Sequence, residues 1–235
     1  MNYKTELHCH TSDVSRCAHS TGKEMAEYYI SLGYTTVVLT NHLSVPTYTA
    51  PATEYLMERS WDEKIDFYMN GYNVMKEAAG DRLNIILGCE LRSQITDGDL
   101  MIYGVTEEFL RACPDMWNIK IKDLSNIIRE NGMIFAQPHP FRNDMKIVNP
   151  DYLDAVEVFN GNLGKNNRNR NDIARMWAEK FDKIQLSGSD THDADYEKKD
   201  RAGIITEEPV RTNEDLLRIL RSRNYELIRY GNLPW

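Results

Sequence analysis

Basic residues are few in this chain, and long apolar runs are absent. Lys and Arg total 28 against 36 Asp and Glu, so the 235-residue chain has a net charge of -8. It lacks the basic stripe that electrostatic binding to duplex nucleic acid requires, and we therefore expect no duplex nucleic acid among its partners. No apolar run approaches the length of a membrane span, about 20 residues, so we expect no membrane partner either.

Cysteine is also scarce. The four cysteines, Cys9, Cys17, Cys89 and Cys113, have no zinc-ribbon spacing. The N-terminal sequence MNYKTELHCH has neither the charged nor the apolar region of a secretory signal. We therefore expect a cytoplasmic protein with free thiols. Cys9, Cys17 and Cys89 lie beside candidate metal ligands, which leaves thiol reactivity or metal contact open for them.

Three common catalytic signatures are missing. The sequence has no G-x-S-x-G elbow, no P-loop and no Rossmann glycine fingerprint, which argues against a serine hydrolase, an NTPase and a dehydrogenase. It also has no internal repeat, no low-complexity segment and no Pro- or Ser-rich linker. Because the length suits a single α/β barrel, we expect one domain over residues 1–235.

Short β-branched runs alternate with longer amphipathic stretches, a pattern typical of βα units around a parallel sheet. The first expected helix, GKEMAEYYISLG at residues 22–33, has apolar positions at helical spacing and a glycine stop. The other expected helices lie at residues 51–80, as one long or two short helices, 125–132, 171–181 and 212–224. The expected strands lie at residues 4–7, 35–40, 84–88, 100–105, 133–137, 155–159 and 184–188.

The sequence TELHCHTSD places two histidines one residue apart at the end of the first expected strand. Side chains two apart on an extended chain point to the same side, so His8 and His10 face together while Cys9 faces away. Two imidazoles that converge in this way could bind a metal ion, although His-x-His also occurs by chance.

Other histidines and several isolated acids also follow expected strands. In a parallel α/β barrel the carboxyl ends of the strands meet on the face that carries the active site, so we expect one metal cluster there. Taken singly, His42 could instead cap a helix and Glu90 could pair with a basic residue. His19 lies in a loop over the same face. The expected metal ligands are His8, His10, His42, Glu90, His139, Asp190 and His192.

The ordered motifs HCH, LTNH, GCE, QPHPFR, EVFNG and SGSDTH resemble those of the PHP family, named after polymerase and histidinol phosphatase proteins. The resemblance implies a distorted TIM-like (β/α)7 barrel of the α/β class and hydrolysis of phosphate esters. It also implies two or three divalent ions, for which Zn, Mn or Fe are suitable. Carried over by motif, the ligands are His8, His10, Glu90 and Asp190 for one ion, Glu90 and His139 for a second, and His42 and His192 for a third.

Three positions depart from the family pattern. Asn41 stands where the family commonly has an aspartate, and only Cys17 and His19 lie near the place of a third early histidine. The segment GDLMIYGVTEE offers acids such as Asp99 in place of a middle histidine. We therefore expect the third ion site to be less complete than the other two.

The expected reaction is attack of a metal-activated water on a small phosphorylated substrate. Glu90, His42 and His192 are the expected catalytic residues. Arg142 and Arg16 are expected to neutralise the phosphate, although either could form a surface ion pair instead. Two other functions stay open: a metal-binding or regulatory module without catalysis, and metal-assisted hydrolysis of a C–N or carboxylic ester bond. The oligomeric state is left open.

Overall fold

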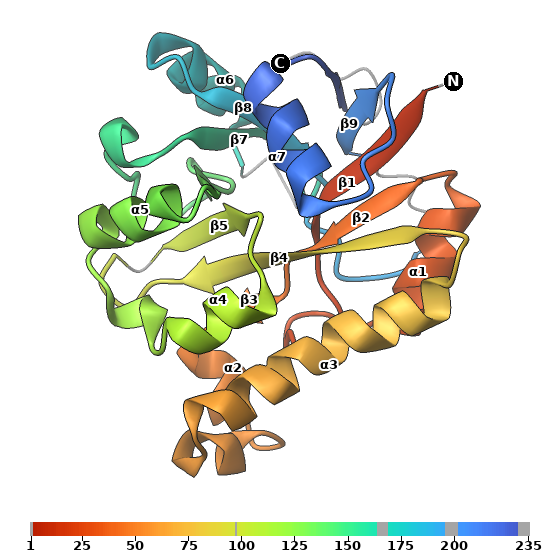
Figure 1. Ribbon diagram of the computed structural model, residues 1–235. Coiled ribbons are helices and arrows are strands. Elements are labelled where there is room, and N and C mark those ends of the chain that lie inside the picture. Colours follow the sequence, from red (N-terminus) through yellow and green to blue (C-terminus); the bar gives the residue numbers. More distant parts are fainter. Residues whose placement is uncertain (1, 97, 164–168, 196–201, 230–235) are drawn as a thin grey trace.

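The computed structural model describes residues 2–96, 98–163, 169–195 and 202–229, whose strands join one strongly curved sheet surrounded by helices (Figure 1). The strands are β1 (Tyr3–Cys9), β2 (Thr36–Leu39), β3 (His42–Leu43), β4 (Asn84–Arg92), β5 (Asp99–Tyr103), β6 (Ile134–Gln137), β7 (Ala155–Asn160), β8 (Ile184–Gly188), β9 (Gly203–Thr206) and β10 (Glu226–Ile228). Their order is β10-β9-β1-β2-β4-β5-β6-β7-β8, with β3 paired to β4.

The sheet closes almost completely into a barrel. The chain just after β8 lies beside β1, where the Asp190 amide donates to the His8 carbonyl at 2.9 Å and the His10 amide donates to the Thr191 carbonyl at 3.0 Å. All seven expected strands are present, and the prediction of a distorted α/β barrel is confirmed.

The sheet is mixed, whereas the sequence pattern predicted a parallel one. β5 runs antiparallel to both β4 and β6, and β9 runs antiparallel to β1. Only residues 93–98 separate β4 from β5, which allows a hairpin but is too short for a parallel crossover. The start of β5, at Asp99, therefore lies at the same end of the barrel as the carboxyl ends of the parallel strands.

Several helices begin at residues that cap them through a side chain, among them α1 (Gly22–Ser31), α3 (Trp61–Ala79), α4 (Glu107–Ala112) and α7 (Asn213–Ser222). Thr21 with Glu24, and Ser60 with Glu63, form capping boxes at the first two long helices. No helix in the described ranges is long and apolar enough to cross a membrane. The other helices are α2 (Val45–Thr49), η1 (Glu54–Glu58), η2 (Met116–Asn118), α5 (Ile121–Glu130), η3 (Pro150–Tyr152) and α6 (Asn171–Lys180).

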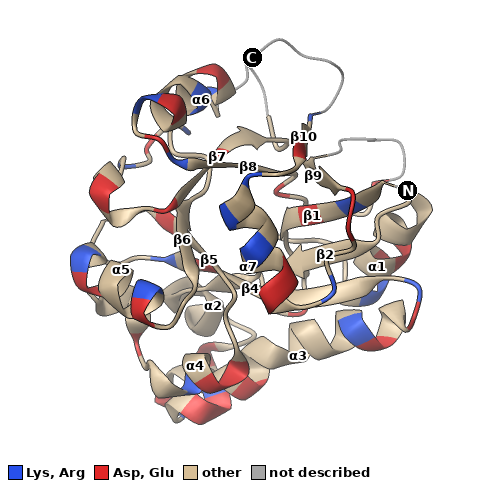
Figure 2. Ribbon diagram, turned by 45° about the horizontal axis from the view of Figure 1, so that its top comes forward, with Lys and Arg blue, Asp and Glu red and all other residues tan. Residues whose placement is uncertain are grey.

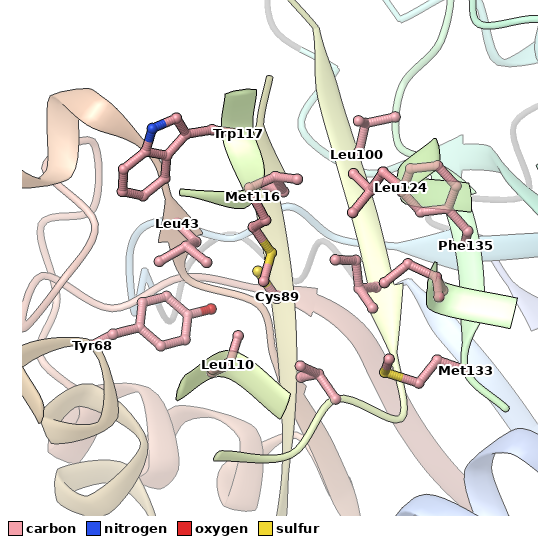
Figure 3. Packing of buried hydrophobic residues seen from close by; sticks show 14 of the residues in the cluster. Leu43, Tyr68, Cys89, Leu100, Leu110, Met116, Trp117, Leu124, Met133 and Phe135 are labelled. Atoms are coloured by element: carbon pink, nitrogen blue, oxygen red, sulfur yellow. The ribbon is translucent and has the colours of Figure 1, made fainter. Parts of the chain in front are cut away.

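Apolar side chains fill both the inside and the outside of the barrel. Outside, Tyr68 of α3 and Leu124 of α5 pack over the outer faces of β4 to β6 (Figure 3). Inside, Leu216 and Leu220 of α7 pack against interior residues such as Met101. α7 therefore closes the end of the barrel at which the parallel strands begin (Figure 1), and the opposite end is left for polar residues.

Candidate metal centre

The seven expected metal ligands come together at the carboxyl ends of the parallel strands, with Glu90 at their centre. Glu90 lies within β4, which runs to Arg92, rather than after the strand. Its Oε2 atom is 3.4 Å from His8 Nε2, 3.2 Å from His10 Nε2 and 3.1 Å from His42 Nδ1. Its Oε1 atom is 3.2 Å from His139 Nε2. One carboxylate thus contacts four imidazoles.

Asp190 and His192 complete the cluster after β8. Asp190 Oδ1 lies 3.4 Å from His8 Nε2 and 3.3 Å from His10 Nε2. The ring of His192 stacks on that of His10 at 4.6 Å between centroids. Asp190 and His139 have positive φ angles, 51° and 29°, a conformation that is uncommon for residues other than glycine. Strained backbone at two ligands is typical of a functional site.

Hydrogen bonds on the far side of two rings determine which nitrogen faces the cluster. His8 Nδ1 lies 2.8 Å from Glu157 Oε1, so the ring donates its proton there. Ser15 Oγ donates to Asn41 Oδ1, and His10 Nδ1 must therefore donate to Ser15, at 3.3 Å. The two Nε2 atoms are left 3.1 Å apart. Two lone pairs at that distance would repel each other, so a proton or a metal ion must lie beside at least one of them.

The electrostatics of the cluster also favour a cation. Burial favours the neutral ring of His8, but Glu157, Asp190 and Glu90 outweigh it and raise the pKa of His8 well above its usual value. Burial opposes ionisation of Glu90 and Asp190, yet the surrounding histidines hold both pKa values well below the usual range. The two acids are ionised and require positive charge, which a divalent ion supplies in place of protons.

Three buried atoms support the same conclusion. Within the described residues, Glu90 Oε2, His42 Nδ1 and His139 Nδ1 have no hydrogen-bond partner, and a buried unpaired polar atom costs about 1 to 3 kcal/mol. Burial lowers the pKa of His42 to about 3 and that of His192 to about 4. These rings are therefore neutral at pH 7 and can act as ligands. The donor set fits divalent ions that accept mixed imidazole and carboxylate ligands.

Among the described residues, candidate ligand atoms fall into four groups of three, each with all atoms within 4.8 Å of one another. Three groups overlap with the ion sites that the motifs imply, although the first lacks Glu90 and the other two also include His8 or His10. The fourth contains Asp99, which the sequence offered without assigning it to a site. Burial and the charge of Glu90 raise the pKa of Asp99 to about 6. The groups are His8, His10 and Asp190; His8, Glu90 and His139; His10, His42 and His192; and His42, Glu90 and Asp99.

Glu157 is a residue that sequence reasoning missed. Its Oε1 accepts from His8 Nδ1, and its Oε2 accepts from the His139 amide at 2.9 Å and from Asn160 Nδ2 at 2.8 Å. One carboxylate therefore orients two ligands. Gly188 makes room for this arrangement, because a Cβ atom there would collide with His8 and with Glu157. The signal in the sequence was an acid within the apolar run AVEVF.

Glu6 is a second missed acid, also within an expected strand. It is fully buried, and its Oε1 accepts from the amides of Leu7, His8 and Ser189 at 2.8 to 3.0 Å. Burial raises the pKa of Glu6 to about 7 against these hydrogen bonds. A bulge in β1 between Glu6 and Cys9 places His8 toward the cluster while Cys9 packs outside with Met25, as expected.

The two arginines expected to bind phosphate lie in different surroundings. Arg142 is largely buried and donates to Asp190 Oδ2 at 2.5 Å and to Asn169 Oδ1 at 2.8 Å. Arg16 is exposed on the loop between β1 and α1. Arg142 is therefore paired with a buried acid of the candidate site rather than with a surface acid. Its contact with phosphate, like that of Arg16, stays a prediction.

The loop between β1 and α1 carries Cys17 and His19, near the place where the family has a third early histidine. This loop borders the cluster. Cys17 Sγ lies 3.0 Å from His192 Nε2, and burial raises the pKa of the thiol to about 12. A cavity of about 350 Å³ beside Asp190 and His192 is lined by Cys17 and His19. Asn41 faces this loop, where its Nδ2 donates to Thr11 Oγ1 at 3.0 Å. An aspartate at that position would lack this donor.

The chain matches the family model described as PHP domain over residues 6–226. Among solved structures it is similar to a two-domain protein from Bacteroides vulgatus, described as containing a predicted PHP-like metal-dependent phosphoesterase, with 17% identity and a TM-score of 0.68 over 97% of this chain and 65% of that chain. It thus spans less than two thirds of that protein. A search of curated proteins found no match.

Two further structures share the fold. One is endonuclease Q in complex with a 27-mer duplex substrate that has an abasic lesion at the active site, with 16% identity and a TM-score of 0.59 over 94% of this chain and 57% of that chain. The other is an amidohydrolase from Chromobacterium violaceum with bound sulfate and no metal, with 14% identity and a TM-score of 0.56 over 97% of this chain and 99% of that chain.

The endonuclease complex corrects one expectation. We predicted that duplex nucleic acid is not among the partners, and that exclusion is wrong, because a protein of the same fold acts on a DNA duplex. Net charge is a sum over the whole chain, whereas the charge that faces a phosphate at the site depends on local groups and bound cations. A total of -8 therefore excludes no phosphate-bearing substrate.

Proposed function

Because this chain belongs to the PHP domain family, we propose that it is a metal-dependent phosphoesterase that hydrolyses a small phosphate ester. The observation that carries the proposal is the position of Glu90, a buried carboxylate whose Oε2 lies among His8, His10 and His42 without a hydrogen-bond partner in the described chain. A site of this composition holds divalent ions, and phosphate oxygens are suitable further ligands for them.

The residues around the cluster have separate roles in this proposal. Bound divalent ions lower the pKa of a coordinated water and offset the charge of the phosphate oxygens. With ions bound, His8 and His10 would be ligands through Nε2, since Glu157 and Ser15 hold their Nδ1 protons. Glu90 belongs to two ligand groups and contacts different histidines with its two oxygens, and His42 and His192 serve the third group.

Arg142 contributes positive charge beside the phosphate while it holds Asp190 in place. Arg16, on the exposed loop, is proposed as a weaker phosphate contact. The substrate binds in the cavity beside Asp190 and His192. Zn, Mn or Fe suit the mixed imidazole and carboxylate donors, and two or three ions fit the ligand groups.

We also propose a cytoplasmic location and a single domain over residues 1–235. All four cysteines are free thiols in the structure, which suits a reducing compartment. The described strands all belong to one sheet, which supports the single domain.

The test compares Asp190→Asn with Asp115→Asn. Both aspartates have left-handed backbone, with φ of 51° and 50°, which asparagine tolerates. Asp115 is exposed and is not close in sequence to any of the expected ligands. With Mn or Zn present, we expect Asp190→Asn to reduce hydrolysis of 4-nitrophenyl phosphate or bis(4-nitrophenyl) phosphate by a factor on the order of 10³, and Asp115→Asn to leave it unchanged. Equal rates in the two variants would sink the proposal.

The same assay distinguishes the proposed function from two alternative functions. A metal-replete protein that turns over neither these esters nor an abasic duplex would be a binding or regulatory module. Hydrolysis of carboxylic esters or amides without competition from inorganic phosphate would indicate the carbonyl chemistry suggested by the amidohydrolase of the same fold.

A further inference from the structure

A second cavity, of about 420 Å³, lies at the other end of the barrel from the metal centre. It is bordered by the residues that precede β6, β7 and β8 and by the carboxyl ends of α5 and α7. The whole length of β8 separates it from the ligands, since Lys183 precedes the strand and Asp190 follows it. The cavity is therefore distinct from the proposed catalytic site.

Basic side chains dominate this cavity although the protein is acidic overall. Its charged lining consists of four basic and two acidic side chains, a formal charge of +2 in a chain of net charge -8. Figure 2 shows Lys and Arg on both α5 and α7. The charged residues are Arg129, Lys183, Arg221, Arg223, Asp154 and Asp182.

The two acids are already paired. Arg129 Nε donates to Asp154 Oδ1 at 2.9 Å, and Arg223 Nη1 donates to Asp182 Oδ1 at 2.5 Å. Asp154 also accepts from the amide of Phe135 at 3.0 Å through its other oxygen. These pairs neutralise two of the four cations and leave the charge of the other two.

Lys183 and Arg221 make their contacts with neutral oxygens. Lys183 Nζ donates to the Leu153 carbonyl at 2.9 Å, and Arg221 Nη2 donates to the Gly132 carbonyl at 2.5 Å. Burial and the charge of Arg129 lower the pKa of Lys183, against the opposite effect of Asp154, Asp151 and Asp182. Neither Lys183 nor Arg221 is paired with a carboxylate in the cavity lining, so their charges are the surplus that an anion would offset.

We propose that this cavity binds a small molecule that bears a phosphate group. A dianion matches the surplus charge, and guanidinium and ammonium groups are the usual phosphate donors in proteins. Met133 and Ile134 provide an apolar wall for the organic part. A smaller cavity of about 190 Å³ shares Lys183 and Arg223 and adds the ring of Tyr225, so an aromatic or apolar extension has room.

The experiment counts phosphate sites by equilibrium dialysis of metal-loaded protein with radiolabelled inorganic phosphate. The test variant combines Lys183→Met with Arg221→Gln, and the matched control is Arg218→Gln on the same helix, whose side chain pairs with Glu208 and Asp215. We expect the test variant to lose one phosphate site, or to bind there at least about tenfold more weakly, and the control to bind as the unmodified protein does.

A second measurement needs no substitution. Inorganic phosphate should slow acetylation of Lys183 by acetic anhydride several-fold in the unmodified protein, as measured by mass spectrometry, and should leave exposed Lys122 unprotected. The proposal is overturned if phosphate protects neither lysine and the test variant keeps every phosphate site. It is also overturned if Asp190→Asn alone removes all phosphate binding. Loss of catalysis in Asp190→Asn has no bearing on it, so the two proposals fail separately.

Discussion

The two ends of the barrel differ in what their charged groups do. At the candidate metal centre, carboxylates and histidines are buried, and three buried atoms lack hydrogen-bond partners within the described chain. At the other end, α7 closes the barrel with apolar side chains, and ion pairs such as Arg223 with Asp182 are exposed. We therefore expect bound divalent ions to stabilise the first end, whereas apolar packing stabilises the second.

Among the changes that test this contrast, substitution of Glu90 should have the largest effect on turnover. We expect Glu90→Gln to lower turnover by a factor on the order of 10³, because Glu90 belongs to two ligand groups and contacts different histidines with its two oxygens. The free energy of unfolding of the chelated protein should change by less than about 2 kcal/mol, since burying a neutral amide avoids the desolvation of a charge. Turnover within tenfold of the unmodified enzyme would show that Glu90 does not hold the ions.

Truncation of a buried side chain at the opposite end should lower stability and leave turnover unchanged. Leu220 of α7 is fully buried against the barrel interior, so we expect Leu220→Ala to reduce the free energy of unfolding by about 2 to 5 kcal/mol. The rate per folded molecule should not change at low temperature. Leu217→Ala, at a partly buried position on the same helix, is the control and should cost less. A rate loss in folded Leu220→Ala would contradict the separation of the two ends.

The ring orientation at the metal centre is tested by Glu157→Gln. The amide cannot accept from both the His8 ring and the His139 amide with the strength of a carboxylate, so we expect metal affinity to fall by about 10 to 100-fold. Excess metal should restore turnover. Glu27→Gln, at an exposed carboxylate paired with Arg82, is the matched control and should bind metal normally. A defect that excess metal does not correct would mean that Glu157 acts on the reaction itself.

The smallest effect is a difference in pH dependence. The pKa values of His8 and His10 are raised because carboxylates outweigh burial, and protons therefore compete with metal from above pH 6.5 downward. Metal affinity should fall by about tenfold per pH unit for each proton displaced. In the chelated protein the pH dependence has the opposite sign. The raised histidine pKa values stabilise the fold at low pH, and this stabilisation is lost as the pH rises through those pKa values.

Thermal unfolding between pH 5 and pH 9, with and without metal, measures both trends. The melting temperature should rise with pH in the loaded protein relative to the chelated one. Parallel curves would mean that His8 and His10 do not exchange protons for metal.

Much of the fold was predictable because its signals are local. Apolar runs located all seven expected strands, and alternation after the first of them correctly placed Cys9 on the side opposite His8 and His10. The seven expected ligands could be named because imidazoles and carboxylates seldom follow buried strands for structural reasons alone. Glu157 was missed because its partner, the His8 ring, is 149 residues away in the sequence.

The sequence by itself determined the donor types and the strands that carry them, since side-chain chemistry and strand alternation are properties of neighbouring residues. Only the tertiary structure decided that β5 runs backward, which brings Asp99 to Glu90, and that Arg142 is tied to Asp190. It also decided where charge collects, with a basic cavity on an acidic chain. Strand direction and local electrostatic potential depend on which distant segments pair. The overall composition of the chain carries no information about that pairing.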